Sequence, residues 1–562
     1  MWPVVADPAH LALGHAGNDV GNHVWGYAWV AAKVQAGQLP DHTALLSWPE
    51  GGSLWFIDTF GALVTLPINA LWGPVAAYNA GYWFNFWLAG VGACVLGTRV
   101  AGTRLGGWLA GVCFMATPQL LGQAYNGISE TLAVGWLPLS IAAVDALLEA
   151  PSVRRAVLAG TLLAVTAVAN WYYGLFAAIF CIGLGVRFLA RSRSGHGPSV
   201  RVLAGPLLLA SVLTLVLAAP PFSVFAATMA ADDALVTRDA AFNWKTLILH
   251  NMTDVEALLH PGRFYSPDLK LVFGEDLIVV VYLGFALLVP AAMGAWYASR
   301  GQARFWVVMS GVFLLFSLGP FLYAGGDYVQ VAGGWVPLPF LALFKWFPMF
   351  SRISHAYRFV IGLSLALSML VAMSVRVARQ RGWDVPVFVV SVAVFRLLET
   401  TLASSAPFPI VTTLVAPPAV LARLEGGAVL DLPVGVPILA RSRFLLTQLV
   451  HGQPVPFGLN EPTPALLYRN HYTGYLLELE RSAVSVLPDA RPYLDIELGR
   501  AALIEAGMRW IVVHQDDYPA AVRKKVEEFL DLTATPVHEG EGLRIYRLDE
   551  AVLPIGVATE NL

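Results

Sequence analysis

The sequence predicts a mainly α-helical membrane protein, with a polytopic bundle of about ten transmembrane helices followed by a small α/β domain. Three observations support this fold class. Of the 562 residues, 57% are hydrophobic and only 13% are charged, whereas about 25% charged is usual in soluble domains. Ten apolar segments run through the chain, and most approach the roughly 20 residues that cross about 30 Å of hydrocarbon. The short gaps between the segments alternate between arginine-rich and arginine-free.

This alternation predicts the topology. The arginine-rich gaps hold 13 of the 35 Lys and Arg residues in a small part of the chain. By the positive-inside rule, these gaps face the cytoplasm, so the other gaps and both ends of the chain must lie outside. The arginine-rich gaps are Arg99–Arg104, Arg154–Arg155, Arg187–Arg201, Arg300–Arg304 and Arg376–Arg381.

Residues 59–75 are also apolar, but Pro67 and Gly73 interrupt them, and the alternation leaves no room for another crossing. A helix that lies in or dips into the membrane interface fits this segment better. We therefore expect a first outer loop and interfacial helix (1–75), a transmembrane bundle (76–405) with a large outer loop at 226–275, and an extracytoplasmic domain (406–562). The predicted spans are 76–98, 105–121, 131–149, 154–169, 171–190, 202–224, 276–297, 304–324, 357–376 and 385–405.

The composition changes near residue 406, where prolines cluster and charged residues then become common. The strand-like runs 428–434, 508–514 and 543–548 alternate with helical stretches such as 520–532. This pattern predicts the small α/β domain.

The amino end shows no signal peptide, because it has neither a basic start nor an apolar stretch of useful length. The topology nevertheless places residues 1–75 outside. The pattern favours a first transmembrane helix that is missing from this chain, and the alternative is a tail translocated by the helices after it.

The first candidate site is GHAGNDVGNHVWGYAW (14–29), which holds Asn18, Asp19 and His23 between glycines and tryptophans. A carboxylate at the membrane surface can act as a general base on an incoming hydroxyl, or can hold a divalent cation against a phosphate. The alternative is a solvated loop acid.

Two further candidates lie in short outer gaps. Glu130 ends QAYNGISE (123–130), where an acid can serve a site or complement a helix dipole. Trp171 and Tyr172 could stack on a sugar, but the pattern favours an aromatic belt at the interface.

Two more candidates lie further along the chain. The long outer loop 226–275 carries His250 and His260, whose spacing does not match the close helical pair of a zinc site. KWFPMFSRISHAYRF (345–359) places three basic side chains on the outer side, against the positive-inside trend. They can clamp a phosphate, and the alternative is snorkelling to lipid headgroups. These residues are Arg352, His355 and Arg358.

These motifs, taken in order, resemble bacterial multi-pass membrane proteins of the GT-C glycosyltransferase type. The resemblance covers nearly the whole chain and rests on the order of the motifs, since none alone is very specific. They are GNDVGNHVWGYAW, the G-x-LP of Gly37–Pro40, WPEGG (48–52), AYN (77–79), NGISE, WLPL (136–139), NWYYGLF (170–176), FPMFSRISHAYRF, VLDLPV (429–434) and VHGQPVPFG (450–458).

The resemblance implies a GT-C fold and an inverting hexosyl- or pentosyltransferase that uses a polyprenyl-phosphate sugar donor. It makes Asp19 the catalytic carboxylate, as general base or metal-linked acid, Glu130 a second acid, and Arg358, then Arg352, the contact to the donor phosphate. Asn18-Asp19 replaces a paired-acid DxD, which leaves metal dependence open, with Asp19 and Glu130 as candidate ligands of Mg or Mn.

The expected setting is the bacterial inner membrane, with a glycan, lipid or protein acceptor on the extracytoplasmic side. The net charge of −3 and the lack of a basic run argue against nucleic acid as a partner. One alternative is a transporter or flippase for lipid-linked saccharides, which predicts charged residues along a pathway in the spans. The spans hold few charges, and Arg396 and Glu399 fit a local ion pair. Another alternative is a non-enzymatic assembly protein.

Overall fold

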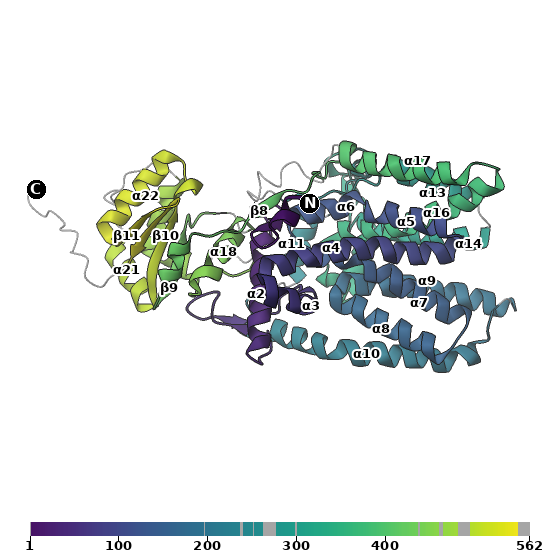
Figure 1. The fold of residues 1–562 in the computed structure, drawn as a ribbon, viewed down its shortest axis with the longest axis horizontal. Helices are drawn as coiled ribbons and strands as arrows, with labels where there is room; N and C mark the ends of the chain where they lie inside the picture. Colours follow the sequence, from purple (N-terminus) through teal and green to yellow (C-terminus); the bar gives the residue numbers. More distant parts are fainter. Residues whose placement is uncertain are drawn as a thin grey trace, which may run out of the picture. The chain divides into compact units, whose positions relative to one another are not determined.

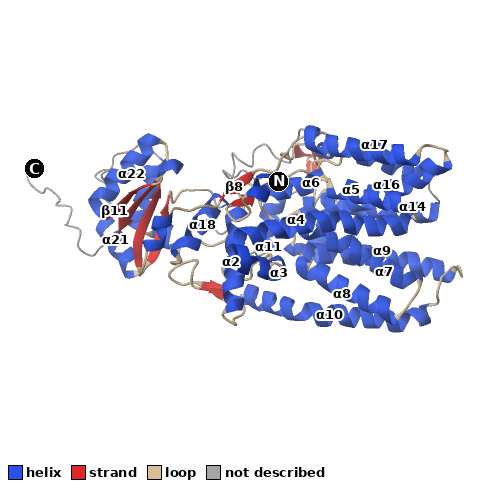
Figure 2. Cartoon of the chain, viewed as in Figure 1, coloured by secondary structure: helices blue, strands red, loops and turns tan. Residues whose placement is uncertain are grey.

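The structure, a computed structural model, is mainly α-helical, as Figure 2 shows in blue. It divides into two compact units. The helical unit comprises residues 1–32, 56–226 and 238–414, and the α/β unit comprises residues 33–55, 227–237 and 415–562. The residues described are 2–195, 197–236, 240–250, 252–261, 277–297, 300–436, 439–459, 465–481 and 495–548.

A helix lies in each of the ten predicted spans, although the helix in 276–297 begins only at Phe285 and the helix in 304–324 ends at Ser317. Within the described ranges, seven helical segments are long and apolar enough to cross a membrane, and two shorter apolar helices fill two more spans. The multi-pass helical bundle is therefore confirmed. Its helices, many of them labelled in Figure 1, are α4 (Leu66–Ala101), α5 (Arg104–Met115), α6 (Pro118–Asn126), η1 (Ser129–Gly135), α7 (Trp136–Glu149), α8 (Val153–Ala169), α9 (Trp171–Arg193), α10 (Val200–Ala230), α13 (Phe285–Tyr297), α14 (Arg300–Ser317), α16 (Val360–Gln380), α17 (Val385–Leu398) and η5 (Glu399–Ala403).

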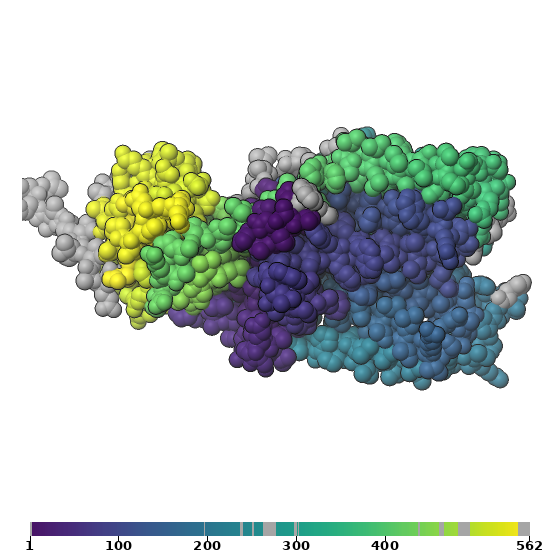
Figure 3. Space-filling model, viewed as in Figure 1, coloured from purple at the N-terminus to yellow at the C-terminus, as the bar shows by residue number. Residues whose placement is uncertain are grey.

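The helices differ in how far their neighbours cover them. Nearly every side chain of α16 is buried, because α4, α5, α13 and α14 pack around it. Helix α10 instead lies along the edge of the bundle in Figures 1 and 3 and leaves Leu208, Leu215 and Val216 exposed. An apolar helix with an apolar exposed surface suits a lipid environment, as the predicted span 202–224 requires.

The segment before the first predicted span is broken where the sequence indicates. Asp58 caps the short helix α3 (Thr59–Val64), with its Oδ1 accepting a hydrogen bond of 3.1 Å from the Gly61 N–H. Gly73 interrupts the helical backbone of α4 with φ 82° and ψ 175°, immediately before Pro74. A straight helix of 36 residues would reach about 54 Å, well beyond the roughly 30 Å of a bilayer core. The kink therefore divides residues 66–72 from the part of α4 that can cross.

The remaining elements of the helical unit surround these spans. Strand β1 (Leu11–Leu13) pairs antiparallel with β8 (Thr412–Leu414), which joins distant parts of the chain. Four short strands form two hairpins that precede α15. The other elements are α1 (Trp2–Ala6), α2 (Val20–Gln35), α11 (Ala240–His250), η2 (Glu256–Leu258), β4 (Tyr323–Ala324), β5 (Asp327–Tyr328), β6 (Gln330–Val331), β7 (Gly334–Trp335), α15 (Pro339–Trp346), η3 (Phe350–Arg352) and η4 (Ala356–Phe359).

The α/β unit has a four-stranded sheet in the order β11-β12-β10-β9, in which only β9 and β10 are parallel. Its core joins the inward side chains of the sheet to those of α20, α21 and α22. The three strands and the helix predicted from the sequence are all present. The elements are β2 (His42–Thr43), β3 (Gly52–Ser53), η6 (Ala419–Arg423), β9 (Ala428–Leu432), η7 (Leu439–Arg441), α18 (Ser442–His451), α19 (Ala465–Arg469), α20 (His471–Arg481), α21 (Ile496–Glu505), β10 (Met508–His514), η9 (Gln515–Asp517), α22 (Ala520–Thr533), β11 (Thr535–Gly540) and β12 (Leu543–Arg547).

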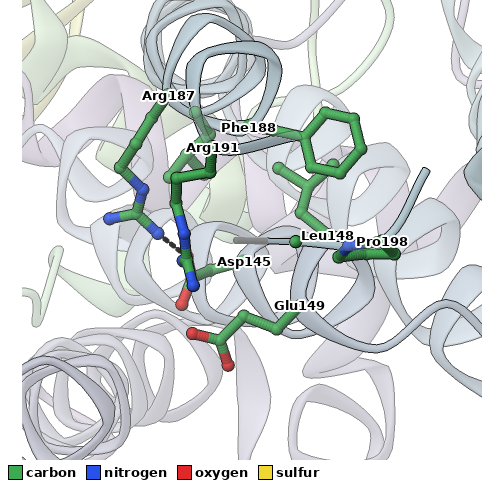
Figure 4. A pocket seen from close by; sticks show the side chains of 9 residues that line it. Asp145, Leu148, Glu149, Arg187, Phe188, Arg191 and Pro198 are labelled. Carbon is green, nitrogen blue, oxygen red and sulfur yellow. Dashed lines mark hydrogen bonds and ion pairs between the residues drawn. The ribbon is translucent and has the colours of Figure 1, made fainter. Parts of the chain in front are cut away.

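Ion pairs join three helices at the arginine-rich end of the bundle. Arg99 lies 3.1 Å from Asp145 and 2.7 Å from Glu149, so it links α4 to α7. Arg187 of α9 pairs with the other oxygen of Asp145. Figure 4 shows these acids and Arg187 at a pocket of about 230 Å³, together with Arg191 and the apolar side chains that complete it. The charges that the sequence places in this region therefore pair with one another.

Candidate active site

Asp19 lies immediately before α2 and is only 7% exposed. Its backbone N–H donates a hydrogen bond of 3.0 Å to the carbonyl oxygen of Asn126, and its carboxylate accepts one of 2.8 Å from the Asn22 side chain. The Asn18 amide also reaches Asn126, at 3.4 Å. The first two outer loops of the sequence thus meet at Asp19 and Asn126.

Glu130 lies in the first turn of η1, where Gly127 ends the preceding helix in a left-handed conformation. Its side chain is 4% exposed, and its carboxylate lies 3.5 Å from His23 Nε2 and 3.9 Å from Arg358 Nη2. The first distance is longer than a normal hydrogen bond, and both lie within ion-pair range. Glu130 therefore connects α2 to the last outer stretch before α16.

Arg358 projects from η4, and its guanidinium contacts the Glu130 carboxyl group and the ring of Tyr172. Its guanidinium carbon lies 4.9 Å from the centre of the Tyr172 ring, within the range of a cation–π contact. Tyr172 and Tyr173 are each 3% exposed, and the Tyr173 hydroxyl donates to the backbone carbonyl of Thr131. Both tyrosines are therefore buried within the bundle. The sequence instead favoured an aromatic belt at the lipid interface.

A chain of hydrogen bonds runs from His23 to a second buried acid, Asp58. His23 Nδ1 lies 2.8 Å from the Ser129 hydroxyl, which also hydrogen-bonds the Asp58 carboxylate. The Tyr27 hydroxyl donates to the same Asp58 oxygen at 2.8 Å. The carboxyl groups of Glu130 and Asp58 therefore lie at opposite ends of the Ser129–His23 pair.

Burial determines the charge of this cluster. It lowers the pKa of His23 to about 4, against the raising effect of the Asp19 charge, so the imidazole is neutral at pH 7. Burial raises the pKa of Asp58 to about 6, although Ser129, Tyr27 and the Gly61 N–H all oppose the shift. The cluster thus combines a neutral histidine, an ionised Asp58 and a guanidinium in an apolar bundle.

The structure brings together Asn18, Asp19, His23, Glu130, Tyr172 and Arg358, six of the residues selected from the sequence. Four other predicted site residues make different contacts. His260 is exposed, with Nδ1 2.9 Å from the Glu256 carbonyl oxygen, and Arg352 is exposed on η3. His355 contacts the Ser354 hydroxyl at 2.7 Å, and Trp171 packs beside Tyr172. The side chain of His250 is outside the described residues.

The sequence reading missed Asp58, Ser129 and Asn126. Asp58 looks like an ordinary helix cap, and it is one, but the same carboxylate also accepts the side-chain bonds of the cluster. Ser129 and Asn126 carry no charge and were passed over inside QAYNGISE, although both surround Glu130.

A metal ion remains a prediction. Among the residues with described positions, no group of three or more His, Cys, Asp or Glu side chains is arranged to hold one. The resemblance implies Asp19 and Glu130 as candidate metal ligands, and both residues belong to the cluster.

No protein-family model matches the sequence, and a search of curated proteins finds no match. Solved structures do match. The arabinofuranosyltransferase AftD from Mycobacteria has a TM-score of 0.53 at 14% identity, over 98% of this chain and 39% of that one. ArnT from Cupriavidus metallidurans bound to undecaprenyl phosphate has a TM-score of 0.44 at 13% identity, over 98% and 96% of the two chains. The apo oligosaccharyltransferase of Archaeoglobus fulgidus has a TM-score of 0.46 at 9% identity, over 96% and 72%.

The match to AftD extends along nearly all of this chain, which spans about two fifths of the length of that protein. At such low identity, the similarity concerns the fold. The helical bundle and this match agree, and the chain has a polytopic helical fold of GT-C type.

Proposed function

We propose that this protein is a membrane glycosyltransferase that moves a sugar from a polyprenyl-phosphate donor to an acceptor hydroxyl on the extracytoplasmic face. One observation carries the proposal. Asp19, Glu130 and Arg358 come from three distant parts of the chain and gather in one buried cluster, at helix ends that the positive-inside rule assigns to the outer side. A polyprenyl-phosphate donor keeps its tail in lipid and its sugar at the headgroup level, where such a cluster is needed.

Asp19 acts as the general base in this proposal. The hydrogen bond from Asn22 orients the carboxylate, and the backbone bond to Asn126 fixes the loop that carries it. Asp19 accepts the proton of the acceptor hydroxyl as the acceptor oxygen bonds to the anomeric carbon. The bond from that carbon to the phosphate oxygen breaks, and the phosphate leaves with the electron pair. A single displacement of this kind inverts the anomeric centre.

Arg358 stabilises the charge on the departing phosphate. Tyr172 holds its guanidinium from one face, and a fixed positive group in a buried site lowers the barrier electrostatically. The planar guanidinium can donate two parallel hydrogen bonds to a phosphate, which a lysine cannot. Glu130 lies beside it, 3.9 Å from Nη2.

The test is a sugar-transfer assay with the purified full-length protein and a radiolabelled polyprenyl-phosphate sugar. Asp19→Asn should lower transfer by at least 100-fold, because general-base catalysis contributes about 10²–10⁴-fold. The matched control is Asp7→Asn, which changes a partly exposed acid paired with His10 and should leave transfer unchanged. Parallel assays with Mg²⁺, Mn²⁺ or a chelator test the metal prediction. Full activity of Asp19→Asn would remove Asp19 from the role.

The same assay separates the transport alternative. A flippase would move the labelled lipid between leaflets without forming a glycosylated product, in wild type and in Asp19→Asn alike. Movement of the lipid without transfer, across a range of acceptors, would overturn the proposed chemistry.

A further inference from the structure

Asn126 lies at the centre of the contacts around Asp19, and it is fully buried. Its backbone carbonyl accepts the Asp19 N–H, while its side-chain amide forms two hydrogen bonds to the backbone of Ile278. Oδ1 accepts the Ile278 N–H at 2.9 Å, and Nδ2 donates to the Ile278 carbonyl at 2.7 Å. The amide thus pairs with both backbone polar groups of one residue, as a residue of a neighbouring antiparallel strand would.

Ile278 belongs to residues 277–284, which we call the strap. The strap has no regular secondary structure, and its residues from Val279 to Leu283 are at most 5% exposed. Irregular backbone at the depth of a membrane is tolerated only where protein covers it and satisfies its polar groups. The partners of the strap therefore determine where it lies.

Arg396 and Glu399 supply the partners at the far end of the strap. Arg396 Nη1 donates to the Leu283 carbonyl at 2.6 Å, and Glu399 accepts from the Tyr282 hydroxyl at 2.8 Å. Glu399 also accepts the first two backbone N–H groups of α13, at 2.7 and 2.9 Å. A carboxylate at a helix amino terminus is stabilised by the helix dipole.

Gly284 shows how tightly this anchor is built. Its φ of 87° favours glycine, and a Cβ there would lie 2.5 Å from both Arg396 Nη1 and Glu399 Oε2. The strap also presses on α6, since a Cβ on Gly122 would lie 3.0 Å from the Val280 side chain. The charges in α17 and η5 thus hold a peptide segment, which differs from the pathway role that a transporter would give them.

We propose that Asn126 is a positioning residue for Asp19, and that the strap, anchored by Arg396 and Glu399, fixes the position of Asn126. The inference rests on the role proposed for Asp19. In this arrangement, two buried charged residues, one in α17 and one in η5, govern the placement of a general base through one asparagine. A misplacement of about 1 Å can cost on the order of 100-fold in rate, so small shifts of the strap are sufficient to affect transfer.

The experiment compares Asn126→Ala, Glu399→Gln and Asn243→Ala in the full-length protein. Asn243 is the matched control, a buried asparagine whose amide donates to the Ser351 carbonyl. We expect Asn126→Ala to lower kcat by about 10- to 100-fold, with KM for the donor within a few-fold of wild type. Glu399→Gln should lower kcat less. Its amide oxygen still accepts one backbone N–H of α13, and only the hydrogen bond at the amide nitrogen is lost. In an Asp19→Asn background, Asn126→Ala should cause no further loss.

Hydrogen exchange supplies a readout that needs no activity. Peptides covering residues 14–23 should exchange faster in Asn126→Ala and Glu399→Gln than in wild type or Asn243→Ala. Unchanged exchange in both variants would overturn the proposal that the strap positions this segment. The transfer assay of Asp19→Asn would still test the proposed function separately. Faster exchange with an unchanged kcat would overturn the positioning role. Absence of transfer by wild type would refute the proposed function, and exchange would then judge the strap alone.

Discussion

Arg358 Nη2 lies 3.9 Å from the carboxylate of Glu130, although the two residues are separated by most of the helical bundle in sequence. Both are nearly buried, so neither group is fully hydrated. Removing the guanidinium leaves the Glu130 carboxyl buried without that neighbour, which destabilises the site. The contact therefore bears on stability as well as on donor binding.

Arg358→Lys should weaken the binding of undecaprenyl phosphate to the purified protein by at least 10-fold. A lysine keeps the charge but loses the planar fork of donors and the stacking over Tyr172. Arg358→Gln should weaken binding further and should also lower the thermal unfolding temperature, because Glu130 then lacks its cation. Arg381→Gln, at an exposed arginine of the predicted cytoplasmic side, is the control. Equal affinities for wild type and Arg358→Lys would contradict the clamp.

The pH dependence of stability should show two opposed effects within the site. The pKa of His23 is lowered from 6.5 to about 4, so the neutral imidazole favours the folded state above pH 6.5 and this stability is lost as pH falls towards 4. The pKa of Asp58 is raised from 3.8 to about 6, so its stabilising effect is present below pH 3.8 and is lost as pH rises through 6. Each shift corresponds to about 3 kcal/mol, and the two act in opposite directions on the free energy of unfolding.

Single substitutions should separate the two effects. In Asp58→Asn, the loss of stability that Asp58 causes as pH rises is removed, so the unfolding temperature should change more favourably from pH 4 to pH 6.5 than in the wild type. In His23→Gln, the gain that His23 causes is removed, so the unfolding temperature should change less favourably from pH 4 to pH 6 than in the wild type. The unfolding temperatures of the two variants should therefore depend on pH in different ways. Parallel curves would show that the two groups bonded to the Ser129 hydroxyl do not have opposed pKa shifts.

Gly135→Ala should destabilise the helical unit. A Cβ at Gly135 would overlap the backbone of Leu88 and Ala89, because η1 packs directly on α4 just after Glu130. Overpacking of this kind typically costs about 1–3 kcal/mol, and it should lower the thermal unfolding temperature. Gly185→Ala on α9 is the matched control, since no atom lies within 4 Å of the added Cβ. Equal unfolding temperatures for the two variants would contradict the close helix contact.

The sequence predicted those features that depend on length, apolarity and charge. Each predicted span holds a helix, and the strands at 428–434 and 508–514 are present, with mostly apolar and buried residues that suit the interior of a sheet. Strand β11 was missed, because its polar and exposed residues give no such apolar run. Patterns of this kind detect a buried face, and an edge strand has little of one.

The candidate site was predictable only in its charged members. Asp19, Glu130 and Arg358 are recognisable because charge is rare in this chain and because the gap pattern places them on one side of the membrane. The partners Asp58, Ser129 and Asn126 depend on tertiary packing, as when Asn126 pairs with a backbone 152 residues away. His260 and Arg352 have suitable chemistry but lie on exposed turns, which no local pattern could reveal.

The sidedness of the chain is the remaining prediction, and it can be tested by cysteine labelling in intact spheroplasts. Lys524 in α22 has a side chain that is 77% exposed, and Ser194 is exposed in an arginine-rich gap. A membrane-impermeant maleimide should label Lys524→Cys in intact spheroplasts and should label Ser194→Cys only after permeabilisation, because the positive-inside rule places the gap in the cytoplasm. The native Cys94, Cys113 and Cys181 lie within helices of the bundle, so the unmodified chain serves as the background control. Labelling of Ser194→Cys before permeabilisation would reverse the topology and place Asp19 and Arg358 on the cytoplasmic side, where an extracytoplasmic donor could not reach them.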